Sequence, residues 1–575
     1  MTNKTQKYKP IDAKIADLVG KHANRAEALL EMLTDLQEQN GSVQPGAVTD
    51  IGRAANIPPA RAYGVASFYS MLNLEERANN VVRVCDGPVC WLCGGETARK
   101  EVEKGLLPAV EWKVTRTSCL GLCDRAPALL INGHQAGPYL PGSQVTQGWL
   151  GQATDYSQPR AGELRVMLAN AGLIDPDSLS SAVEYGAYHG LKAALERDPV
   201  AVLSEVEASG LTGRGGAGFP AGRKWRFVYQ AKRTPKYIVC NADESEPLIF
   251  KDRVLIDTNP HQILEGIAIA GYACGANEAF IYIRGEYASQ AKRLEHAIHE
   301  AEQAGWLGDR IQGTGFSFHI RVHLGAGAYI CGEETALIES LEGKRGEPRT
   351  RPPYPPAFGY HGLPTLVNNV ESYAAVPAII LNGSGWYHSL SAAAIPGTKL
   401  YMLLGHINQP GLFEAPFGLT LRQLIDGFGG GMKDGSHFNF ALTGGAAGTI
   451  VSETLLDIPI DYASAAKGIS LGAGAFLICD QHVSVVALLR QLLYFFRMES
   501  CGKCTPCRVG TYRAYEILER MTQGHGQPGD VDELFALAEV MFDSSFCGLG
   551  QSVPIPMRSA LAQFPQAFRD AEKSF

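Results

Sequence analysis

The chain has 575 residues, of which 45% are hydrophobic and 19% are charged, as expected for a globular protein of several domains. Its net charge of −8 disfavours nucleic-acid binding, which usually needs a basic patch or stripe. The polar N-terminus leads into no apolar stretch, and no uncharged run of about 18 apolar residues occurs. We therefore expect a cytoplasmic protein that does not insert into a membrane.

The sequence divides into six segments of different texture. Alternating strand and helix patterns predict an α/β multidomain protein. In chain order we expect an N-terminal helical part at 1–75, a cysteine-containing α/β domain at 76–155, a linker at 156–185, a central α/β domain at 186–395, a small glycine-rich domain at 396–482 and a C-terminal helical domain at 483–575.

The first two segments contain one well-marked helix and two short strands. Apolar side chains at helical spacing predict a helix from Asn24 to Gln39, with Asn24 as its N-cap and Asn40-Gly41 as its stop. Strands are predicted at Val81–Val84, which leads into Cys85, and at Val110–Val114, which leads towards Cys119.

The central segments predict strands that alternate with helices. The strands are expected at Tyr237–Cys240 and Ala279–Ile283, with a helix from Glu286 to Ala304 after them. Another strand, Lys399–Leu404, opens the small glycine-rich domain. This alternation is typical of layered α/β domains.

The C-terminal cysteines carry the strongest chemical signal. Cys501, Cys504 and Cys507 have C-x2-C-x2-C spacing, and Cys547 is the only later cysteine and so the natural fourth ligand. Such a triad is typical of a [4Fe–4S] cluster. Four thiolates also suit zinc, but the triad does not divide into two C-x2-C pairs. We favour the cluster, with zinc as the alternative.

A second group of cysteines lies near the N-terminus. Cys85 and Cys90 form a C-x4-C pair, and Cys119 and Cys123 form a C-x3-C pair. Two such pairs on two loops can supply the four thiolates of a [2Fe–2S] centre, with zinc again as the alternative. Cys93 is a rival ligand, but the paired spacing favours Cys90. The remaining cysteines are expected to be small buried apolar residues.

Two glycine-rich loops and two acidic loops lie in the central segment. Gly213–Pro220 offers closely spaced backbone N–H groups that can cradle a phosphate, with Arg214 and Lys224 as nearby cations. Asn241–Glu246 follows a strand, and Gly325–Thr335 ends in the paired acids Glu333 and Glu334. One acidic pair at a helix start is explained by the helix dipole. The combination of four loops favours a binding site.

Together these motifs resemble the FMN- and NADH-binding subunit of respiratory complex I and related NAD-linked dehydrogenases. The similarity runs from about Gly186 to Phe575, while residues of about 10–150 resemble the thioredoxin-like [2Fe–2S] subunit of the same enzymes. The fusion of both is similar to the diaphorase subunits of soluble NAD-dependent formate dehydrogenases and NAD-reducing hydrogenases. The resemblance implies a Rossmann-like FMN domain, a ubiquitin-like (SLBB) domain at 396–482 and a helical [4Fe–4S] domain.

The resemblance also implies a role for individual residues. The expected FMN-binding residues are Gly213, Arg214, Gly215, Lys224, Asn241, Asp243, Glu244, Gly332, Glu333, Asn368 and Asn369. The expected NADH-binding residues are Phe219, Phe227, Glu246, Glu334, Arg351 and Tyr354. A carboxylate near the ribose 2′-hydroxyl would repel the extra phosphate of NADPH.

Two features depart from the family pattern. Arg351-Pro352-Pro353-Tyr354 stands where the family often has Lys-Pro-Pro-Phe, and arginine at a nucleotide contact could loosen the discrimination against NADPH. The interval from Cys90 to Cys119 is also short for the family, which puts the geometry of the intervening loop in doubt.

The resemblance implies an electron-transfer enzyme with no acid or base residue. NAD(H) would exchange hydride with FMN, which can release single electrons to iron–sulfur clusters. The implied partners are further iron–sulfur subunits and a catalytic subunit, with formate dehydrogenase slightly favoured over hydrogenase. The alternatives are a complex I arm and, from other classes, a scaffold with a dead flavin site or a zinc-bearing interaction protein.

Overall fold

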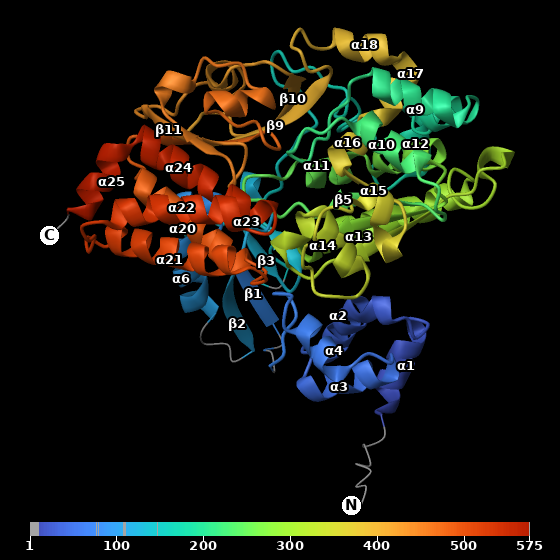
Figure 1. Ribbon diagram of the computed structural model, residues 1–575, viewed down its shortest axis with the longest axis horizontal. Helices are drawn as coiled ribbons and strands as arrows, with labels where there is room; N and C mark the ends of the chain where they lie inside the picture. The colour runs from blue at the N-terminus through green and yellow to red at the C-terminus, as the bar shows by residue number, and fades with distance from the viewer. Residues whose placement is uncertain (1–10, 76–77, 79, 107–110, 147, 574–575) are drawn as a thin grey trace, which may run out of the picture.

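The computed structural model describes residues 11–75, 78, 80–106, 111–146 and 148–573. Figure 1 shows the N-terminal helices as a lobe of their own, with the C-terminal helices, the small β domain and the central α/β domain grouped beside one another. Within the described residues, no helix is both long enough and apolar enough to cross a membrane.

The N-terminal part is helical, as predicted, but its main helix begins later than expected. Asn24 adopts a left-handed conformation (φ 54°), whereas an N-cap needs extended backbone. A 3₁₀ turn, Ala26–Ala28, therefore precedes the helix, which ends at the left-handed Gly41 as predicted. The helices are α1 (Ala13–Lys21), α2 (Leu29–Asn40), α3 (Pro45–Ala54) and α4 (Pro59–Ala66).

The first α/β domain is built on a four-stranded sheet in the order β2-β1-β3-β4. Strand β1 is parallel to β2 and antiparallel to β3. Strand β2 begins at Trp112, later than predicted, and Val110 lies outside the described residues. The elements are β1 (Asn80–Cys85), α5 (Pro88–Leu92), α6 (Gly95–Leu106), β2 (Trp112–Thr117), β3 (Leu129–Ile131) and β4 (His134–Ala136).

The central domain has a fully parallel sheet in the order β7-β6-β5-β8. All four carboxyl ends therefore meet at one edge, where open α/β sheets bind ligands. Its strands are β5 (Tyr237–Ala242), β6 (Glu278–Ile283), β7 (His319–Leu324) and β8 (Thr365–Asn369).

Helices surround this sheet and bury its apolar side chains. The predicted helix from Glu286 is split into a 3₁₀ turn, Gly285–Tyr287, and α13. The helices are α8 (His189–Leu195), α9 (Pro199–Ala208), α10 (Ala221–Gln230), α11 (Lys251–Thr258), α12 (Pro260–Cys274), α13 (Ala288–Gln303), α14 (Glu334–Leu341), α15 (Pro355–Phe358), α16 (Val370–Ala374), α17 (Val376–Asn382) and α18 (Ser384–Ser389).

The small domain is a five-stranded mixed sheet in the order β10-β9-β13-β11-β12. Strands β9 and β13 are parallel, and the other pairs are antiparallel. Its aromatic side chains, among them Phe413 and Phe428, stack in a core separate from the main one. The elements are β9 (Thr398–Gly405), β10 (Gly411–Pro416), α19 (Leu421–Gln423), β11 (Phe438–Thr443), β12 (Thr449–Val451) and β13 (Ala475–Asp480).

The C-terminal domain is a helical bundle, as predicted. Cys504 stands at the N-cap of α21 and Cys547 at the N-cap of α23, so both helix starts face the cysteine group. The helices are α20 (Val485–Glu499), α21 (Thr505–Thr522), α22 (Asp530–Ser544), α23 (Gly548–Ser552), α24 (Pro554–Gln563) and α25 (Pro565–Glu572).

The segment predicted as a linker is fastened to the small domain, and includes only one helix among its described residues, α7 (Leu179–Glu184). The Arg160 guanidinium donates to three carbonyl oxygens of the small domain, those of Gln409, Pro410 and Phe428. The buried Glu414 carboxylate accepts the consecutive N–H groups of Val166, Met167 and Leu168 at 2.9–3.0 Å. The segment 156–185, which we call the strap, is therefore packed against the small domain.

The strap gives a prediction for Glu414. Glu414→Ala leaves three N–H groups without an acceptor, two of them buried, at about 1 kcal/mol each, so the free energy of unfolding should fall by about 3 kcal/mol. Glu414→Gln keeps an amide oxygen for the three donors and should lose less than half of that. Urea denaturation of both variants measures this. Equal losses in both would show that the carboxylate charge, and not acceptance of these bonds, matters.

Candidate functional site

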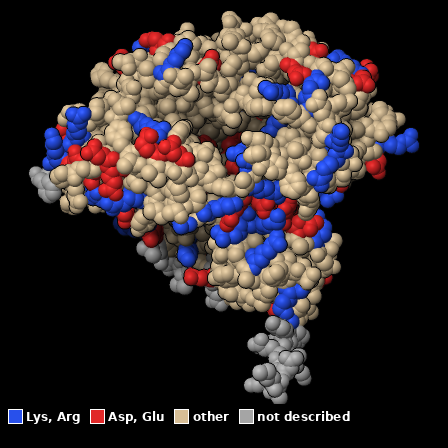
Figure 2. All heavy atoms as spheres, viewed as in Figure 1, with Lys and Arg blue, Asp and Glu red and all other residues tan. Residues whose placement is uncertain are grey.

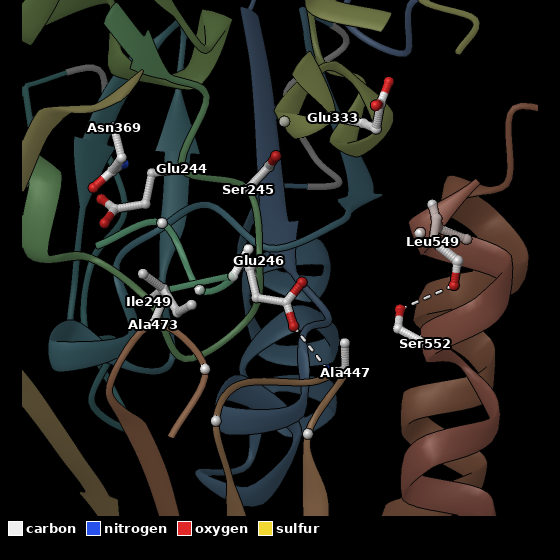
Figure 3. A pocket seen from close by; sticks show the side chains of 18 of the residues that line it. Glu244, Ser245, Glu246, Ile249, Glu333, Asn369, Ala447, Ala473, Leu549 and Ser552 are labelled. Atoms are coloured by element: carbon white, nitrogen blue, oxygen red, sulfur yellow. Dashed lines mark hydrogen bonds between the residues drawn. The ribbon is translucent and has the colours of Figure 1, made fainter. Parts of the chain in front are cut away.

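Two neighbouring cavities open at the carboxyl edge of the central sheet. The larger has a volume of about 1090 Å³ and the smaller about 540 Å³. Figure 2 shows this face of the molecule hollowed near its middle, and Figure 3 shows the smaller cavity from close by. Both cavities are bordered by Gly215, Ala217, Asn241, Gly332, Glu333, Asn369 and Gly548, so they form one continuous site.

The structure brings together all but one of the residues predicted to bind FMN or NADH. The larger cavity is lined by Gly213, Lys224, Asn368, Phe219, Phe227, Glu334, Arg351 and Tyr354. The smaller is lined by Asp243, Glu244 and Glu246. Gly215, Asn241, Gly332, Glu333 and Asn369 line both.

Arg214 is the exception, because its side chain turns away from the cavities. The guanidinium is fully buried, donates to the hydroxyl groups of Thr212 (2.6 Å) and Tyr387 (2.8 Å), and lies over the Phe417 ring. The prediction that Arg214 supplies a cation to a phosphate is therefore corrected. Arg214 instead supports the glycine-rich loop from beneath and joins it to the small domain.

The glycine-rich loop forms an open cradle at the cavity wall. Its ends are joined by the N–H of Gly213, which donates to the Phe219 carbonyl at 2.8 Å, and Tyr462 of the small domain donates to the Gly213 carbonyl at 2.9 Å. Gly218 has a φ of 66°, and a Cβ there would lie 2.5 Å from the Tyr462 ring. Gly213, Gly215 and Gly218 line the larger cavity, so the loop presents backbone and not long side chains to that space, as a phosphate site requires.

A buried network of ion pairs lies at the floor of the smaller cavity. None of its four charged residues was singled out from the sequence. The Lys251 ammonium donates to Asp252 at 2.6 Å and to the Asn369 amide oxygen at 2.7 Å, and lies 3.2 Å from Glu371. Lys399 of the small domain pairs with Glu371 at 2.5 Å. Burial alone would lower the pKa of Lys251, but the Asp252 and Glu371 carboxylates raise it, so Lys251 is a permanent cation beside the cavity.

Two of the predicted acidic residues cap helices. Glu244 accepts the N–H groups of Asp252 and Arg253 at the start of α11, and burial raises its pKa to about 8. Glu333 accepts the N–H groups of Thr335 and Ala336 and is the N-cap of α14. Its position at a helix start is therefore explained by interaction with that helix. Its second oxygen, Oε1, is buried without a hydrogen-bond partner at the cavity wall. The same oxygen forms a long ion pair, 3.5 Å, with Arg351.

Glu246 joins the central domain to the small domain. Its carboxylate accepts the N–H of Ala447 at 2.8 Å, the contact marked in Figure 3, and the hydroxyl of Tyr329. Burial raises the pKa of Glu246 to about 7, and that of its neighbour Asp243 also to about 7. Both groups therefore change charge near neutral pH.

The mouth of the larger cavity combines exposed aromatic rings with ion pairs. Phe219, Phe227 and Tyr354 are 45%, 44% and 56% exposed and line the same cavity. Lys224 pairs with Glu334 at 2.7 Å. Arg351 lies 3.5 Å from Glu333 and 3.8 Å from Glu334. Flat rings beside paired charges suit a nucleotide, whose bases stack and whose ribose and phosphates are polar.

The four N-terminal cysteines predicted as ligands converge in the first α/β domain. The Sγ atoms of Cys119 and Cys123 are 3.7 Å apart. That matches the edge, about 3.8 Å, of a tetrahedron of thiolates bound about 2.3 Å from a metal. The Cys85 thiol contacts those of Cys119 and Cys90, and these contacts raise its pKa. Cys93 is exposed and outside this group, as the paired spacing predicted.

The C-terminal cysteines lie beside the cavities. Cys501 and Cys504 are partly exposed, whereas Cys507 and Cys547 are buried. Backbone N–H groups of Gly550 and Leu549 face the Cys547 thiol and partly offset the burial that raises its pKa. Gly548, the next residue along the chain, lines both cavities. The cysteine group is therefore in contact with the wall of the binding site.

All thirteen cysteines lie in the part of the chain that the structure describes and are free thiols. Four thiolates suit zinc as well as an iron–sulfur cluster.

Comparison with known families and proteins assigns the same three parts. Residues 15–144 match the thioredoxin-like [2Fe-2S] ferredoxin family, 206–378 the Nuo51 FMN-binding domain, and 487–571 the NADH-ubiquinone oxidoreductase-F iron-sulfur binding region. These matches confirm the fold class and the cofactor set of FMN, [4Fe–4S] and [2Fe–2S].

Several known proteins align with about two thirds or more of this chain. The HndC component of the NADP-reducing hydrogenase of Solidesulfovibrio fructosivorans is 46% identical over 71% of this chain and 83% of its own length. The F component of the NADH-quinone oxidoreductase of Escherichia coli K12 is 43% identical over 66% of this chain and 86% of its own length. The crystal structure of an air-oxidized NAD+-reducing [NiFe]-hydrogenase superposes with a TM-score of 0.81 and 31% identity, covering 95% of this chain and 94% of that chain.

The two cysteine groups predict separate losses of iron. Cys85→Ser should lose about two irons per chain and Cys507→Ser about four, because each removes a ligand of one cluster only. Cys93→Ser should keep the full iron content. Iron and sulfide analysis of anaerobically purified variants, with EPR spectra of the reduced protein, measures this. Loss of iron in the Cys93 variant, or none in the Cys85 variant, would contradict the assignment.

Proposed function

Because this chain belongs to the family of the NADH-quinone oxidoreductase F component, whose members are flavin- and iron–sulfur-containing oxidoreductases, we propose that it exchanges hydride between NAD(H) and FMN and passes single electrons to a larger complex. The observation that carries the proposal is the position of Gly548. It follows the cluster ligand Cys547 and lines both cavities of the nucleotide site. The same wall of the cavity thus borders both the nucleotide site, where hydride is exchanged, and the cysteine group through which electrons leave.

FMN, when bound, converts a hydride into single electrons that clusters can accept. The chain supplies binding and orientation. The glycine-rich cradle and the Lys251 ammonium suit the negative phosphate, and Asn241, held by its bond to the Gly332 carbonyl at 2.8 Å, suits the flavin edge. The exposed rings Phe219 and Phe227 suit the adenine. No side chain needs to transfer a proton.

The two cysteine groups have different tasks in this proposal. The C-terminal group, beside the cavity wall, is the exit for electrons. The N-terminal cysteine group lies on the side of Glu244, since Arg284 bonds the carbonyls of both Cys119 and Glu244, and a [2Fe–2S] centre held there would serve as a store or branch for one electron. We propose a cytoplasmic location, because free thiols and thiolate-ligated clusters suit a reducing compartment.

We propose that the partners are further iron–sulfur subunits and a catalytic subunit. Of the two soluble enzymes whose diaphorase subunits the fusion resembles, we slightly favour formate dehydrogenase. Hydrogenase and quinone-linked partners are supported equally well by the proteins that this chain resembles, since their names include both kinds. Purification of the native complex separates them: molybdenum or tungsten indicates formate dehydrogenase, nickel indicates a [NiFe]-hydrogenase, and reduction of a quinone by the complex indicates quinone-linked partners.

The enzyme proposal is tested against an inactive scaffold by NADH-dependent reduction of ferricyanide. The anaerobically purified protein should contain about one flavin per chain, bleach on addition of NADH and reduce ferricyanide with a turnover of at least about 1 s⁻¹. Cys507→Ser should keep flavin bleaching but lose reduction of the [4Fe–4S] centre. A protein that binds flavin and both clusters but does not bleach with NADH would be a scaffold.

Glu246 gives a prediction about NADPH. Glu246→Gln removes a carboxylate that would repel a 2′-phosphate, so kcat/KM for NADPH relative to NADH should rise about tenfold, equivalent to about 1.4 kcal/mol. Because burial raises the pKa of Glu246 to about 7, the wild-type ratio should fall as pH rises through 7, and the variant should show a weaker dependence.

The matched control is Glu265→Gln. Glu265 is also a buried carboxyl whose pKa burial raises to about 7, but it accepts the N–H of Leu191 and lines neither cavity. Steady-state kinetics with both nucleotides, from about pH 6 to about pH 8, measure the ratio. The same rise in both variants, or none in the Glu246 variant, would exclude Glu246 as the selecting carboxylate.

A further inference from the structure

The loop that carries Cys119 and Cys123 is packed directly against the central domain. Arg253 of α11 pairs with Asp124, just beyond the loop, at 2.7 Å, and its Nε donates to the Gly121 carbonyl at 3.2 Å. Gly121 has a φ of 68°, and a Cβ there would lie 2.0 Å from the Tyr287 hydroxyl. The contact is therefore too close for any side chain at this position of the loop.

Arg284 is the central residue of this contact. It follows β6 directly, is 2% exposed, and donates from Nη2 to the backbone carbonyl of the cluster ligand Cys119. Its Nη1 donates to the backbone carbonyl of Glu244 at 2.6 Å, and Glu244 lines the smaller cavity. One planar guanidinium thus bridges a cluster ligand and the flavin pocket.

The remaining donors of Arg284 fix its orientation. Nε donates to Glu286 at 3.1 Å, and Nη2 lies 2.9 Å from the other Glu286 oxygen. The Tyr287 ring lies under the guanidinium, 5.1 Å from its carbon, and the Tyr287 hydroxyl bonds Glu244 at 3.1 Å. Because arginine presents five donors in a rigid fork, no other side chain can hold both carbonyls and the carboxylate together.

These bonds determine which way the peptide groups of the loop point. The C=O and N–H of a trans peptide lie on opposite edges of one plane. Since the Cys119 carbonyl is held by Arg284, the Leu120 N–H faces away from Arg284, and the Gly121 N–H already lies 3.5 Å from the Cys119 sulfur. Hydrogen bonds to the sulfurs, local charge and solvent exposure are what set the reduction potential of an iron–sulfur cluster.

We propose that Arg284 is a positioning residue that ties the [2Fe–2S] centre to the flavin pocket and raises the reduction potential of that centre. It does so by turning the Cys119 carbonyl away from the cluster and by placing a buried cation behind the ligand. Loss of this fork lets the carbonyl turn towards the cluster, which stabilises the oxidised form. The proposal rests on the [2Fe–2S] assignment and not on the use of NADH.

The test compares three variants of the full chain with both clusters loaded. Arg284→Lys keeps the charge beside Glu286 but cannot hold both carbonyls. The double variant Arg284→Gln/Glu286→Gln removes the ion pair without leaving a buried charge unpaired. The control is Arg349→Lys, because Arg349 likewise combines ion pairs, to Glu339 and Glu342, with a bond to a carbonyl, that of Gly359, and none of these partners belongs to the loop of Cys119 and Cys123.

Each protein is titrated with dithionite and redox mediators, and the [2Fe–2S] EPR signal is followed, with the [4Fe–4S] signal as internal reference. In both Arg284 variants the ratio of reduced to oxidised [2Fe–2S] should fall at least tenfold at the wild-type midpoint, which is about 59 mV for one electron. The control and the [4Fe–4S] centre should not shift.

Three results would overturn the proposal. The first is an unchanged [2Fe–2S] midpoint in both Arg284 variants. The second is an equal shift of both clusters, which indicates a general loss of structure. The third is loss of the [2Fe–2S] signal alone, which makes Arg284 only a folding residue. Because dithionite is the reductant, failure of NADH to bleach the flavin refutes the proposed function and leaves this titration readable.

Discussion

The site depends on the buried charges around Lys251. Lys251, Asp252, Glu371 and Lys399 lie together in the interior, where an unpaired ion would cost several kcal/mol. They come from the start of α11, from α16 after β8, and from β9 of the small domain. Each charge is tolerated only when the others are in place. The network therefore fixes the angle between the central sheet and the small domain, and so the shape of the cavity between them.

Around that fixed point, short polar contacts bring three further segments to the cavity. Glu246 reaches the Ala447 N–H, Tyr462 reaches the glycine-rich loop, and Gly548 brings the C-terminal cysteines to the wall. The segments are remote in sequence, and no single domain contains the site. A cofactor bound there would be bordered by four parts of one chain, which brings the nucleotide site close to the C-terminal cysteines.

The sequence predicted what local spacing can determine. Cysteine intervals predict cluster ligands and glycine runs predict cradles, and the strands β5, β6 and β9 were predicted from apolar runs of the right length. The sequence did not predict contacts between residues that are far apart along the chain. The sequence around Arg214 does not indicate that its guanidinium turns inward to Tyr387. The sequence around Lys251 and Arg284 likewise does not indicate which carboxylates and carbonyls these side chains bind. The left-handed Asn24 moved a helix start, and the strap at 156–185 has a loop composition but packed contacts.

The strap has a consequence for stoichiometry. The Arg253–Asp124 pair and the Arg284 fork already hold the [2Fe–2S] domain in place, so association does not require the covalent connection. The covalent connection adds a fixed ratio of one first α/β domain to one flavin site. The HndC and Escherichia coli F relatives match 71% and 66% of this chain, whereas the matched chain of the NAD+-reducing [NiFe]-hydrogenase covers 95% of it. In this chain the first α/β domain cannot separate from the flavin site by dissociation or dilution. Every flavin site that this protein makes is accompanied by one copy of the auxiliary centre, whatever the levels at which other subunits are produced.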